Sequence, residues 1–256
     1  MSAVGHFRIE NISIAFGGLK AVSNFNLDLP AQSLYGLIGP NGAGKTTVFN
    51  LITGVYLPDA GDMHLGDLNL KGLRPFEITK AGLARTFQNI RLFRDLTVLQ
   101  NVLISYHMRV PYTYLDAFLR TPRFIAVEKK WEEQAMSLLT LMGLAHRRND
   151  QAKDLSYGNQ RRLEIVRGLA TNPKVLFLDE PAAGLNSQEK VQLMQTIANI
   201  RDRFNVSILL IEHDMKLVMG ICEKISVLDH GETIAVGTPK EIQSNPRVIE
   251  AYLGGV

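Results

Sequence analysis

A glycine-rich segment near the start of the chain has the composition of a phosphate-binding loop. Residues 39–46, Gly-Pro-Asn-Gly-Ala-Gly-Lys-Thr, match the pattern G-x-x-x-x-G-K-[ST], and they follow the apolar run Leu34–Ile38 and open the helical stretch Thr46–Gly54. Glycines let backbone N–H groups turn toward phosphate oxygens, and the helix N-terminus adds partial positive charge. Lys45 supplies a full charge, and the Thr46 hydroxyl is a hard oxygen suited to Mg²⁺. The segment predicts a nucleoside triphosphate site.

Two carboxylates follow an apolar run in the second half of the chain. Val175–Leu178 leads directly into Asp179 and Glu180, and ligands of parallel α/β sheets bind beyond the carboxyl ends of the strands. Asp179 is placed to hold Mg²⁺ through water, and Glu180 to polarise the water that attacks the γ-phosphate. Alone, the two could equally be solvated acids that start a turn. Together with the phosphate loop they predict nucleotide hydrolysis.

A third segment, Leu155–Arg162, has the features of a helix start. Ser156 is a good N-cap residue and Gly158 permits close backbone approach. Such a helix start is a second potential anion site, although an ordinary capped helix is the better interpretation of this segment alone. The apolar positions that give the following helix its periodicity are Leu163, Val166 and Ala170.

These segments together resemble the ATP-binding-cassette (ABC) superfamily. Leu155–Arg162 is similar to the family's signature sequence, with Tyr157 where the family usually has Gly and Asn159 where it usually has Gln. The phosphate-facing pair, Ser156 and Gly158, is kept. In the family this segment completes the ATP site of the opposite subunit. The resemblance therefore implies a dimer with ATP between the two subunits, and the departures leave that contact intact.

Four further segments stand in the family's order. Gln88 matches the glutamine that reaches Mg²⁺ and the attacking water, and Phe16 stands where the family carries an aromatic that stacks on adenine. His213 matches the switch histidine, whose imidazole can hydrogen-bond the γ-phosphate and hold Glu180. Ala183–Asn186 resembles the loop that crosses the dimer interface, with Asn in place of the usual final Asp. Each taken singly has an ordinary structural explanation; their order carries the resemblance.

The resemblance assigns roles to the matching residues. It implies ATP and Mg²⁺ as cofactors. The catalytic residues would be Glu180, His213, Gln88 and Lys45, and the metal ligands Thr46, Gln88 and Asp179. The nucleotide-binding residues would be Phe16, Gly39, Pro40, Asn41, Gly42, Ala43, Gly44, Lys45, Thr46, Thr47, Ser156 and Gly158.

The order of the elements predicts an α/β chain. Ile9, Ile12 and Ile14 are spaced like a half-buried strand, and Asn24–Leu29 repeats that pattern beyond the Gly17-Gly18 turn. The resemblance implies that this N-terminal β region is antiparallel. From residue 174, short apolar runs alternate with helical stretches, which predicts parallel strands covered on both faces.

Other stretches complete the predicted organisation. Asp59–Asp62 is expected to be a turn, Thr233–Gly237 an edge strand, and Pro239–Val256 only short helical turns. From about residue 90 to 165 strand patterns vanish, and helical periodicity replaces them. We expect one P-loop NTPase domain with its core at 1–88 and 166–256 and a helical signature subdomain at 89–165. An apolar stripe in that subdomain comprises Ala135, Leu138, Leu139 and Met142.

Composition excludes several classes. The 256 residues include 28 Lys+Arg and 25 Asp+Glu, and a net charge of +3 is too weak to indicate a nucleic-acid binder. One cysteine, Cys222, excludes an internal disulfide and is expected to be a small buried hydrophobe. The first residues lack a basic stretch followed by an apolar one, so no signal peptide is expected. No run approaches about 18 apolar residues, so we expect no membrane span.

A narrower resemblance covers nearly the whole chain. The runs RTFQNIRLF, SYGNQRRLEI, LDEPAAGLN, LLIEHDMKLVMG and GTPKEIQSNPRVIEAYLGG are similar to ATPase subunits of bacterial branched-chain amino-acid importers, the LivG type. This implies a peripheral subunit on the cytoplasmic face of the inner membrane, under two integral-membrane permease subunits. Its dimer partner would be a second related ATPase or itself, a periplasmic solute-binding protein for Leu, Ile and Val would act indirectly, and no nucleic acid is implied.

A contact surface for the permease is expected after Gln88. In the family, a cleft beside this segment receives a short permease helix. Arginines at 85, 91 and 94 surround apolar residues that suit an amphipathic helix, although each apolar residue could equally pack within the protein. The apolar residues are Phe87, Ile90, Leu92, Phe93, Leu96 and Val98.

Three other classes of P-loop protein fit the sequence less well. An ABC ATPase of DNA maintenance needs a long coiled coil, which the span from Gln88 to Leu155 is too short to hold. Translation ATPases carry two cassettes per chain, whereas each motif occurs once in this chain. A P-loop phosphotransferase would lack the Ser156–Gly158 element and would not need Glu180. Within transport, the alternatives are an importer for urea or another amino acid and a lipopolysaccharide exporter.

Overall fold

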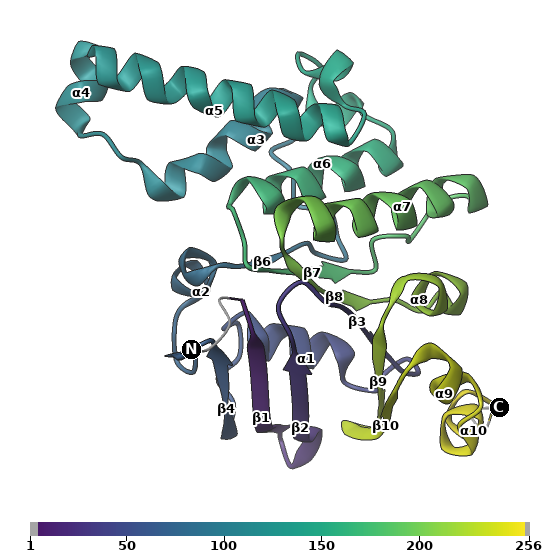
Figure 1. Ribbon diagram of the computed structural model, residues 1–256. Coiled ribbons are helices and arrows are strands. Elements are labelled where there is room, and N and C mark those ends of the chain that lie inside the picture. Colours follow the sequence, from purple (N-terminus) through teal and green to yellow (C-terminus); the bar gives the residue numbers. More distant parts are fainter. Residues whose placement is uncertain (1–4, 254–256) are drawn as a thin grey trace. The chain divides into compact units, whose positions relative to one another are not determined.

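The computed structural model describes residues 5–253, which fall into two compact units (Figure 1). Unit 1 comprises residues 1–85 and 174–256, and unit 2 comprises residues 86–173. The chain leaves unit 1 after strand β6 (Leu83–Arg85) and re-enters it just before β7 (Val175–Asp179). Unit 2 is therefore an insertion between two strands of unit 1.

The smaller sheet of unit 1 is antiparallel, as expected. Its order is β2-β1-β4-β5. Ile9, Ile12 and Ile14 are buried along β1, as their spacing predicts. The strands are β1 (Phe7–Phe16), β2 (Leu19–Leu29), β4 (Ala60–Leu65) and β5 (Leu68–Asn69).

The turn predicted at Asp59–Asp62 is wrong, because Ala60 already begins β4. Gly61 lies inside this strand with φ +85°, and a Cβ there would come within 2.4 Å of the carbonyl oxygens of Glu10 and Asn11. The register between β1 and β4 shifts beside it, between Glu10 and Ser13. Gly61 thus allows β1 and β4 to approach closely. From sequence alone, a glycine with this role cannot be distinguished from a glycine in a turn.

The larger sheet carries the predicted parallel strands. Its order is β10-β9-β3-β8-β7-β6, with β10 antiparallel at the edge and the others parallel. Every residue of β7 and β8 is buried, and both strands are apolar except for Asp179 at the end of β7 and Ser207 at the start of β8. The further strands are β3 (Leu34–Ile38), β8 (Ser207–Ile211), β9 (Lys224–Asp229) and β10 (Glu232–Gly237).

One hydrophobic core joins the two sheets through helix α1 (Lys45–Ile52). The Phe177 ring makes edge-to-face contacts with Phe7 at 5.6 Å and Phe49 at 5.5 Å between ring centroids, linking the small sheet, the large sheet and α1. Short helices do end the chain, although residues 254–256 lie outside the described part. The other helices of unit 1 are α2 (Pro75–Ala81), α7 (Ser187–Phe204), α8 (Met215–Ile221), α9 (Pro239–Gln243) and α10 (Pro246–Leu253).

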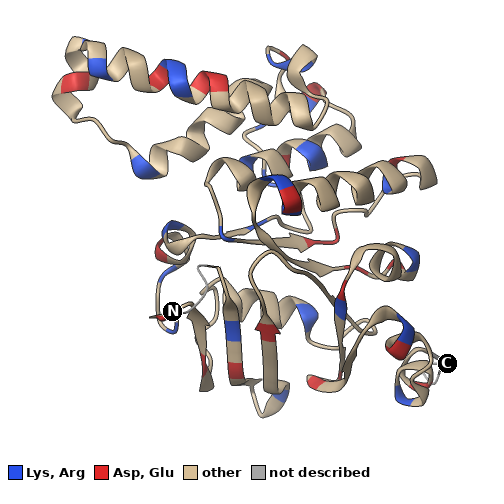
Figure 2. Ribbon diagram, in the orientation of Figure 1, with Lys and Arg blue, Asp and Glu red and all other residues tan. Residues whose placement is uncertain are grey.

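Unit 2 is helical, and its residues are all described. It contains α3 (Val98–Tyr106), α4 (Tyr114–Leu119), α5 (Pro122–Leu141) and α6 (Tyr157–Ala170). The predicted apolar stripe of α5 is buried, as are Leu163, Val166 and Ala170 of α6. Figure 2 shows acidic and basic residues interspersed along the rest of α5. Charges of both signs on the opposite side of the helix complete its amphipathic pattern.

Cys222 is buried, and desolvation raises the pKa of its thiol, as expected for a small core residue. Across residues 5–253, the helices are all too short or too polar to cross a bilayer.

Candidate functional site

The phosphate loop connects β3 to α1, and two of its glycines lie against the backbone of neighbouring segments. A Cβ on Gly39 would lie 2.1 Å from the carbonyl oxygen of Leu228, and one on Gly44 would lie 2.6 Å from that of Ala21. Gly44 also has φ +101°, a conformation that favours glycine, at the position that caps α1. These glycines therefore fix the path of the loop by letting it pass against neighbouring backbone.

The side chain of Lys45 is enclosed by the loop. Its Nζ donates hydrogen bonds to the carbonyl oxygens of Gly39 at 2.7 Å and Pro40 at 2.8 Å. Burial lowers the pKa of Lys45, and the negative charges of Glu180 and Asp179 act in the opposite direction. The ammonium thus bonds only neutral carbonyls within the loop, although carboxylates lie near enough to influence it. A phosphate would give it a charged partner.

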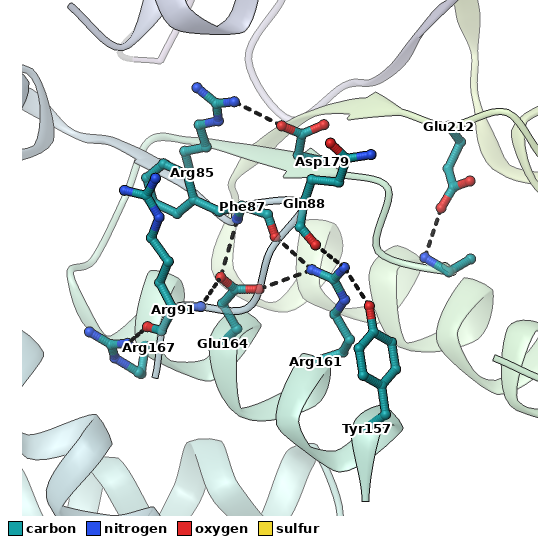
Figure 3. Close-up of polar contacts among 11 residues, drawn as sticks. Arg85, Phe87, Gln88, Arg91, Tyr157, Arg161, Glu164, Arg167, Asp179 and Glu212 are labelled. Carbon is teal, nitrogen blue, oxygen red and sulfur yellow. Dashed lines mark hydrogen bonds and ion pairs between the residues drawn. The ribbon is translucent and has the colours of Figure 1, made fainter. Parts of the chain in front are cut away.

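Asp179 is held by a buried arginine, as Figure 3 shows. Nη2 of Arg85 lies 2.8 Å from a carboxylate oxygen of Asp179, and both side chains are almost fully buried. Nη1 of Arg85 donates to the Asn50 side chain at 2.8 Å and to Thr53 Oγ1 at 3.2 Å. Arg85 therefore fixes the Asp179 carboxylate relative to α1. The expectation that Arg85 borders an exposed groove is wrong, because its guanidinium points into unit 1.

Glu180 occupies a strained turn immediately after β7. It has φ +48°, unusual for a residue with a side chain, and its N–H donates to the carbonyl oxygen of Ile211 at 2.9 Å. His213 lies close, with its Nδ1 3.9 Å from Glu180 Oε1, and 62% of the histidine side chain is exposed. The two side chains can thus act on one solvent-accessible point.

Glu212, which we did not single out in the sequence, stabilises this turn. Its Oε1 accepts the N–H of Ala182 at 2.7 Å, and its side chain is fully buried. Burial raises the pKa of Glu212, and the hydrogen bond from Ala182 opposes the shift. Its position beside His213 in the sequence was the available clue, since a carboxylate at the end of an apolar strand needs partners.

Phe16 is exposed at the end of β1, with 45% of its surface accessible, so it is not a core residue. Its ring makes an edge-to-face contact with Tyr56 at 5.2 Å between centroids. Tyr56, itself exposed, is a second aromatic that the motifs did not indicate. An exposed aromatic pair can present a stacking surface to a nucleobase.

The remaining candidate residues lie in unit 2. Gln88 is exposed, Ser156 is exposed at the N-cap position of α6, and Gly158 is half-buried in its first turn. The Ser156 hydroxyl makes no capping hydrogen bond, contrary to expectation. Asn186 of unit 1, by contrast, caps α7 by accepting the N–H groups of residues 188 and 189.

The donors proposed for a metal are hard oxygens, which suit Mg²⁺. Thr46 is exposed in the first turn of α1, and Asp179 lies at the end of β7. Within residues 5–253, no three His, Cys, Asp or Glu side chains form a metal-binding cluster. A Mg²⁺ ion that keeps most of its waters needs only one or two such protein ligands, so these residues fit it.

Known proteins resemble this chain in both sequence and structure. A family model described as ABC transporter matches residues 22–183, and one described as branched-chain amino acid ATP-binding cassette transporter matches residues 232–256. The high-affinity branched-chain amino acid transport ATP-binding protein LivG of Escherichia coli K12 is 48% identical over 96% of each chain. The corresponding protein BraF of Pseudomonas aeruginosa is 45% identical over the same shares. A crystal structure of the ADP conformation of an ABC transporter's ATP-binding cassette has a TM-score of 0.84, with 30% identity over 97% of this chain and 98% of that one.

Proposed function

Because this chain belongs to the ABC transporter family, we propose that it hydrolyses ATP to power a bacterial importer of leucine, isoleucine and valine. The arrangement of unit 1 carries the ATPase assignment: Lys45 lies within the phosphate loop, and Glu180 and His213 face one accessible point. The choice of solute is supported by 48% identity to a branched-chain amino acid transport protein across 96% of both chains.

The residues of unit 1 divide the chemistry among them. Lys45 would exchange its carbonyl partners for phosphate oxygens, and Phe16 would stack on adenine. Glu180 would orient the attacking water and accept its proton, with His213 close enough to hold it in place. Thr46 and Asp179, with Gln88 as a further ligand, would hold Mg²⁺, which neutralises charge on the phosphates.

The working form in this proposal is a dimer with ATP between subunits. The phosphate loop of one subunit, including Asn41, Gly42, Ala43 and Thr47, would face Ser156 and Gly158 of the other. Ser156 is exposed and its hydroxyl is not used in capping, so it can bind an anion at the N-terminus of α6. Sedimentation of Glu180→Gln should show more dimer with ATP than with ADP. Equal dimerisation, tested also with the related ATPase added, would contradict this arrangement.

Permease subunits at the cytoplasmic face of the membrane would contact the segment after Gln88. Phe93 is 47% exposed and Leu92 is half-buried, whereas Val98 is fully buried and serves the core of unit 2. Aspartate at Leu92 or Phe93 should weaken co-purification with the permease and leave ATP binding intact. Val191→Asp, an exposed apolar position on α7, is a matched control. Normal assembly of both variants would place the contact elsewhere.

Uptake measurements test the proposed function directly. Deletion of the gene in its host should abolish high-affinity uptake of radiolabelled leucine. The wild-type gene should restore uptake, and Glu180→Gln should not. If the deletion leaves leucine uptake unchanged but abolishes uptake of urea or of another amino acid, or export of lipopolysaccharide, the ATPase belongs to that transporter instead.

A further inference from the structure

Three charged side chains of α6 hold the backbone of residues 87–91, here called the clamped segment (Figure 3). Glu164 Oε1 accepts the N–H of Phe87 at 3.2 Å and that of Arg91 at 3.3 Å. Arg161 donates to the carbonyl oxygen of Phe87 at 2.6 Å and to that of Gln88. Arg167 donates to the carbonyl oxygen of Arg91. The clamped segment is therefore bound at both ends through both kinds of backbone group.

Arg161, Glu164 and Arg167, here called the clamp, supply the hydrogen bonds that a helix or strand would otherwise provide to this backbone. Residues 86–92 form neither helix nor strand, so their backbone groups need partners from elsewhere. Rings add to the contact: the Arg91 guanidinium lies 4.0 Å from the Phe87 ring centroid, and that of Arg167 lies 5.0 Å from the Phe93 ring centroid. An irregular loop held in this way has one defined path.

The two central residues, Arg161 and Glu164, are buried. Arg161 is 3% exposed and Glu164 is 5% exposed, and they form an ion pair at 3.4 Å. Burial raises the pKa of Glu164, and the hydrogen bonds from Phe87 and Arg91 oppose that shift. A buried ion pair gains little by itself unless further hydrogen bonds satisfy both partners. Here those further bonds come from the clamped segment, so the pair and the segment depend on each other.

The same arginine reaches the beginning of α6. Arg161 donates a hydrogen bond to the Tyr157 hydroxyl at 2.8 Å, and its guanidinium lies 5.3 Å from the centroid of that ring. Tyr157 directly follows Ser156 and precedes Gly158. A short path of contacts therefore runs from the main chain of Gln88 through Arg161 to the N-terminus of α6.

We propose that Arg161 and Glu164 are positioning residues for ATP hydrolysis, because they make Gln88 and the Ser156–Gly158 helix start one rigid body. The two elements then engage or leave their nucleotides together. The inference rests on the proposed ATPase function. It predicts that loosening the clamp slows hydrolysis without weakening the ATP contacts that unit 1 makes through Lys45.

Steady-state ATPase kinetics on the full chain provide the test. Glu164→Ala should lower kcat by about 10- to 100-fold, the range expected for misplaced catalytic groups, and change the ATP dissociation constant by less than about 3-fold. Glu164→Gln retains an acceptor for the N–H groups of Phe87 and Arg91 and should recover most of the rate. Glu133→Ala, an exposed position on α5, is the matched control and should equal the wild type.

Hydrogen exchange separates positioning from general destabilisation. In Glu164→Ala the amides of Phe87 and Arg91 should exchange faster, whereas those of α6 remain protected. If Glu164→Ala does not fold, Arg161→Lys decides in the same way, since lysine keeps the charge but cannot span the carbonyls of Phe87 and Gln88. Unchanged kcat, or parallel loss of kcat, ATP affinity and α6 protection, would overturn the inference. Lack of ATPase activity in the wild type would instead refute the proposed function.

Discussion

The phosphate loop of unit 1 and the clamped segment of unit 2 are both irregular stretches, but they are fixed in different ways. Gly39 and Gly44 hold the loop by omitting a side chain where backbones meet. The clamped segment is held by side chains, with Arg161 standing 74 residues further along the chain than its partner Phe87. A loop fixed by backbone contact carries a sequence motif of its own, whereas one fixed by distant charged residues carries none within the loop itself. The two should therefore fail differently when altered.

The largest expected effect separates chemistry from binding in unit 1. Glu180→Gln should keep ATP binding and lower hydrolysis by about 10²–10⁴-fold, because it removes the base that we propose for the attacking water. Lys45→Ala should instead weaken ATP binding itself, since the loop loses its only full charge. Isothermal titration and phosphate release measure the two quantities. Near-normal turnover by Glu180→Gln would remove its assigned role.

A second prediction tests whether backbone contact fixes the loop. Gly39→Ala should lower the free energy of unfolding by at least about 2 kcal/mol more than Gly42→Ala, as measured by urea denaturation without nucleotide. A methyl group on Gly39 would lie 2.1 Å from the Leu228 carbonyl oxygen, whereas one on Gly42, with φ +83°, would have no atom within 4 Å. Both glycines have a positive φ at which alanine is strained, so the collision with the Leu228 carbonyl oxygen is the contact that distinguishes the two variants. Equal destabilisation would show that the close approach is not what holds the loop.

Loss of the proposed nucleobase contact in unit 1 is expected to have a smaller effect than the changes to the phosphate loop. Phe16→Ala should weaken ATP affinity by about 1–3 kcal/mol, the usual value of one aromatic stacking contact, and Phe16→Tyr should preserve it. Competition with GTP is a second measure of the contact. Because stacking discriminates weakly between bases, Phe16→Ala should weaken the binding of GTP and of ATP to a similar extent. ATP affinity unchanged in Phe16→Ala would leave the base contact to Tyr56 or to other residues.

The smallest effect is expected at the edge of the clamp. Tyr157→Phe removes the acceptor of one Arg161 hydrogen bond but keeps the ring beneath the guanidinium. Because Arg161 keeps its bonds to the carbonyl oxygens of Phe87 and Gln88, kcat should fall by less than about 10-fold and by less than in Glu164→Ala. A larger loss than in Glu164→Ala would mean that the tyrosine, not the carboxylate, organises the segment.

The sequence predicted the features that depend on local pattern. The short apolar runs form buried parallel strands, and the P-loop motif forms a loop between β3 and α1. Two errors arose where one residue type serves two purposes: Gly61 marks a strand contact rather than a turn, and Arg85 is buried rather than exposed. Charge alone does not reveal whether an arginine has a carboxylate partner within the fold.

The clamp was beyond such reasoning for a related reason. Arg161 and Glu164 read as the polar side of an amphipathic helix, yet both are buried beside Leu163 and Ile165. Their partners are backbone groups of an irregular segment, which any sequence at 87–91 would supply. The available clue was the spacing of the two charges, three residues apart on one helix, with Leu163 and Ile165 on either side of Glu164.

The entry and exit of unit 2 have an evolutionary consequence. Strands β6 and β7 are parallel neighbours in the sheet, with Leu83 paired to Val175. Residues 86–173 are thus a single crossover connection between adjacent strands, the kind of link that parallel pairing always requires. The stretches of this connection that lie between its proposed functional residues can therefore change in length without changing the order of any strand. Evolution can vary those stretches and leave the strands that carry the phosphate loop unaltered.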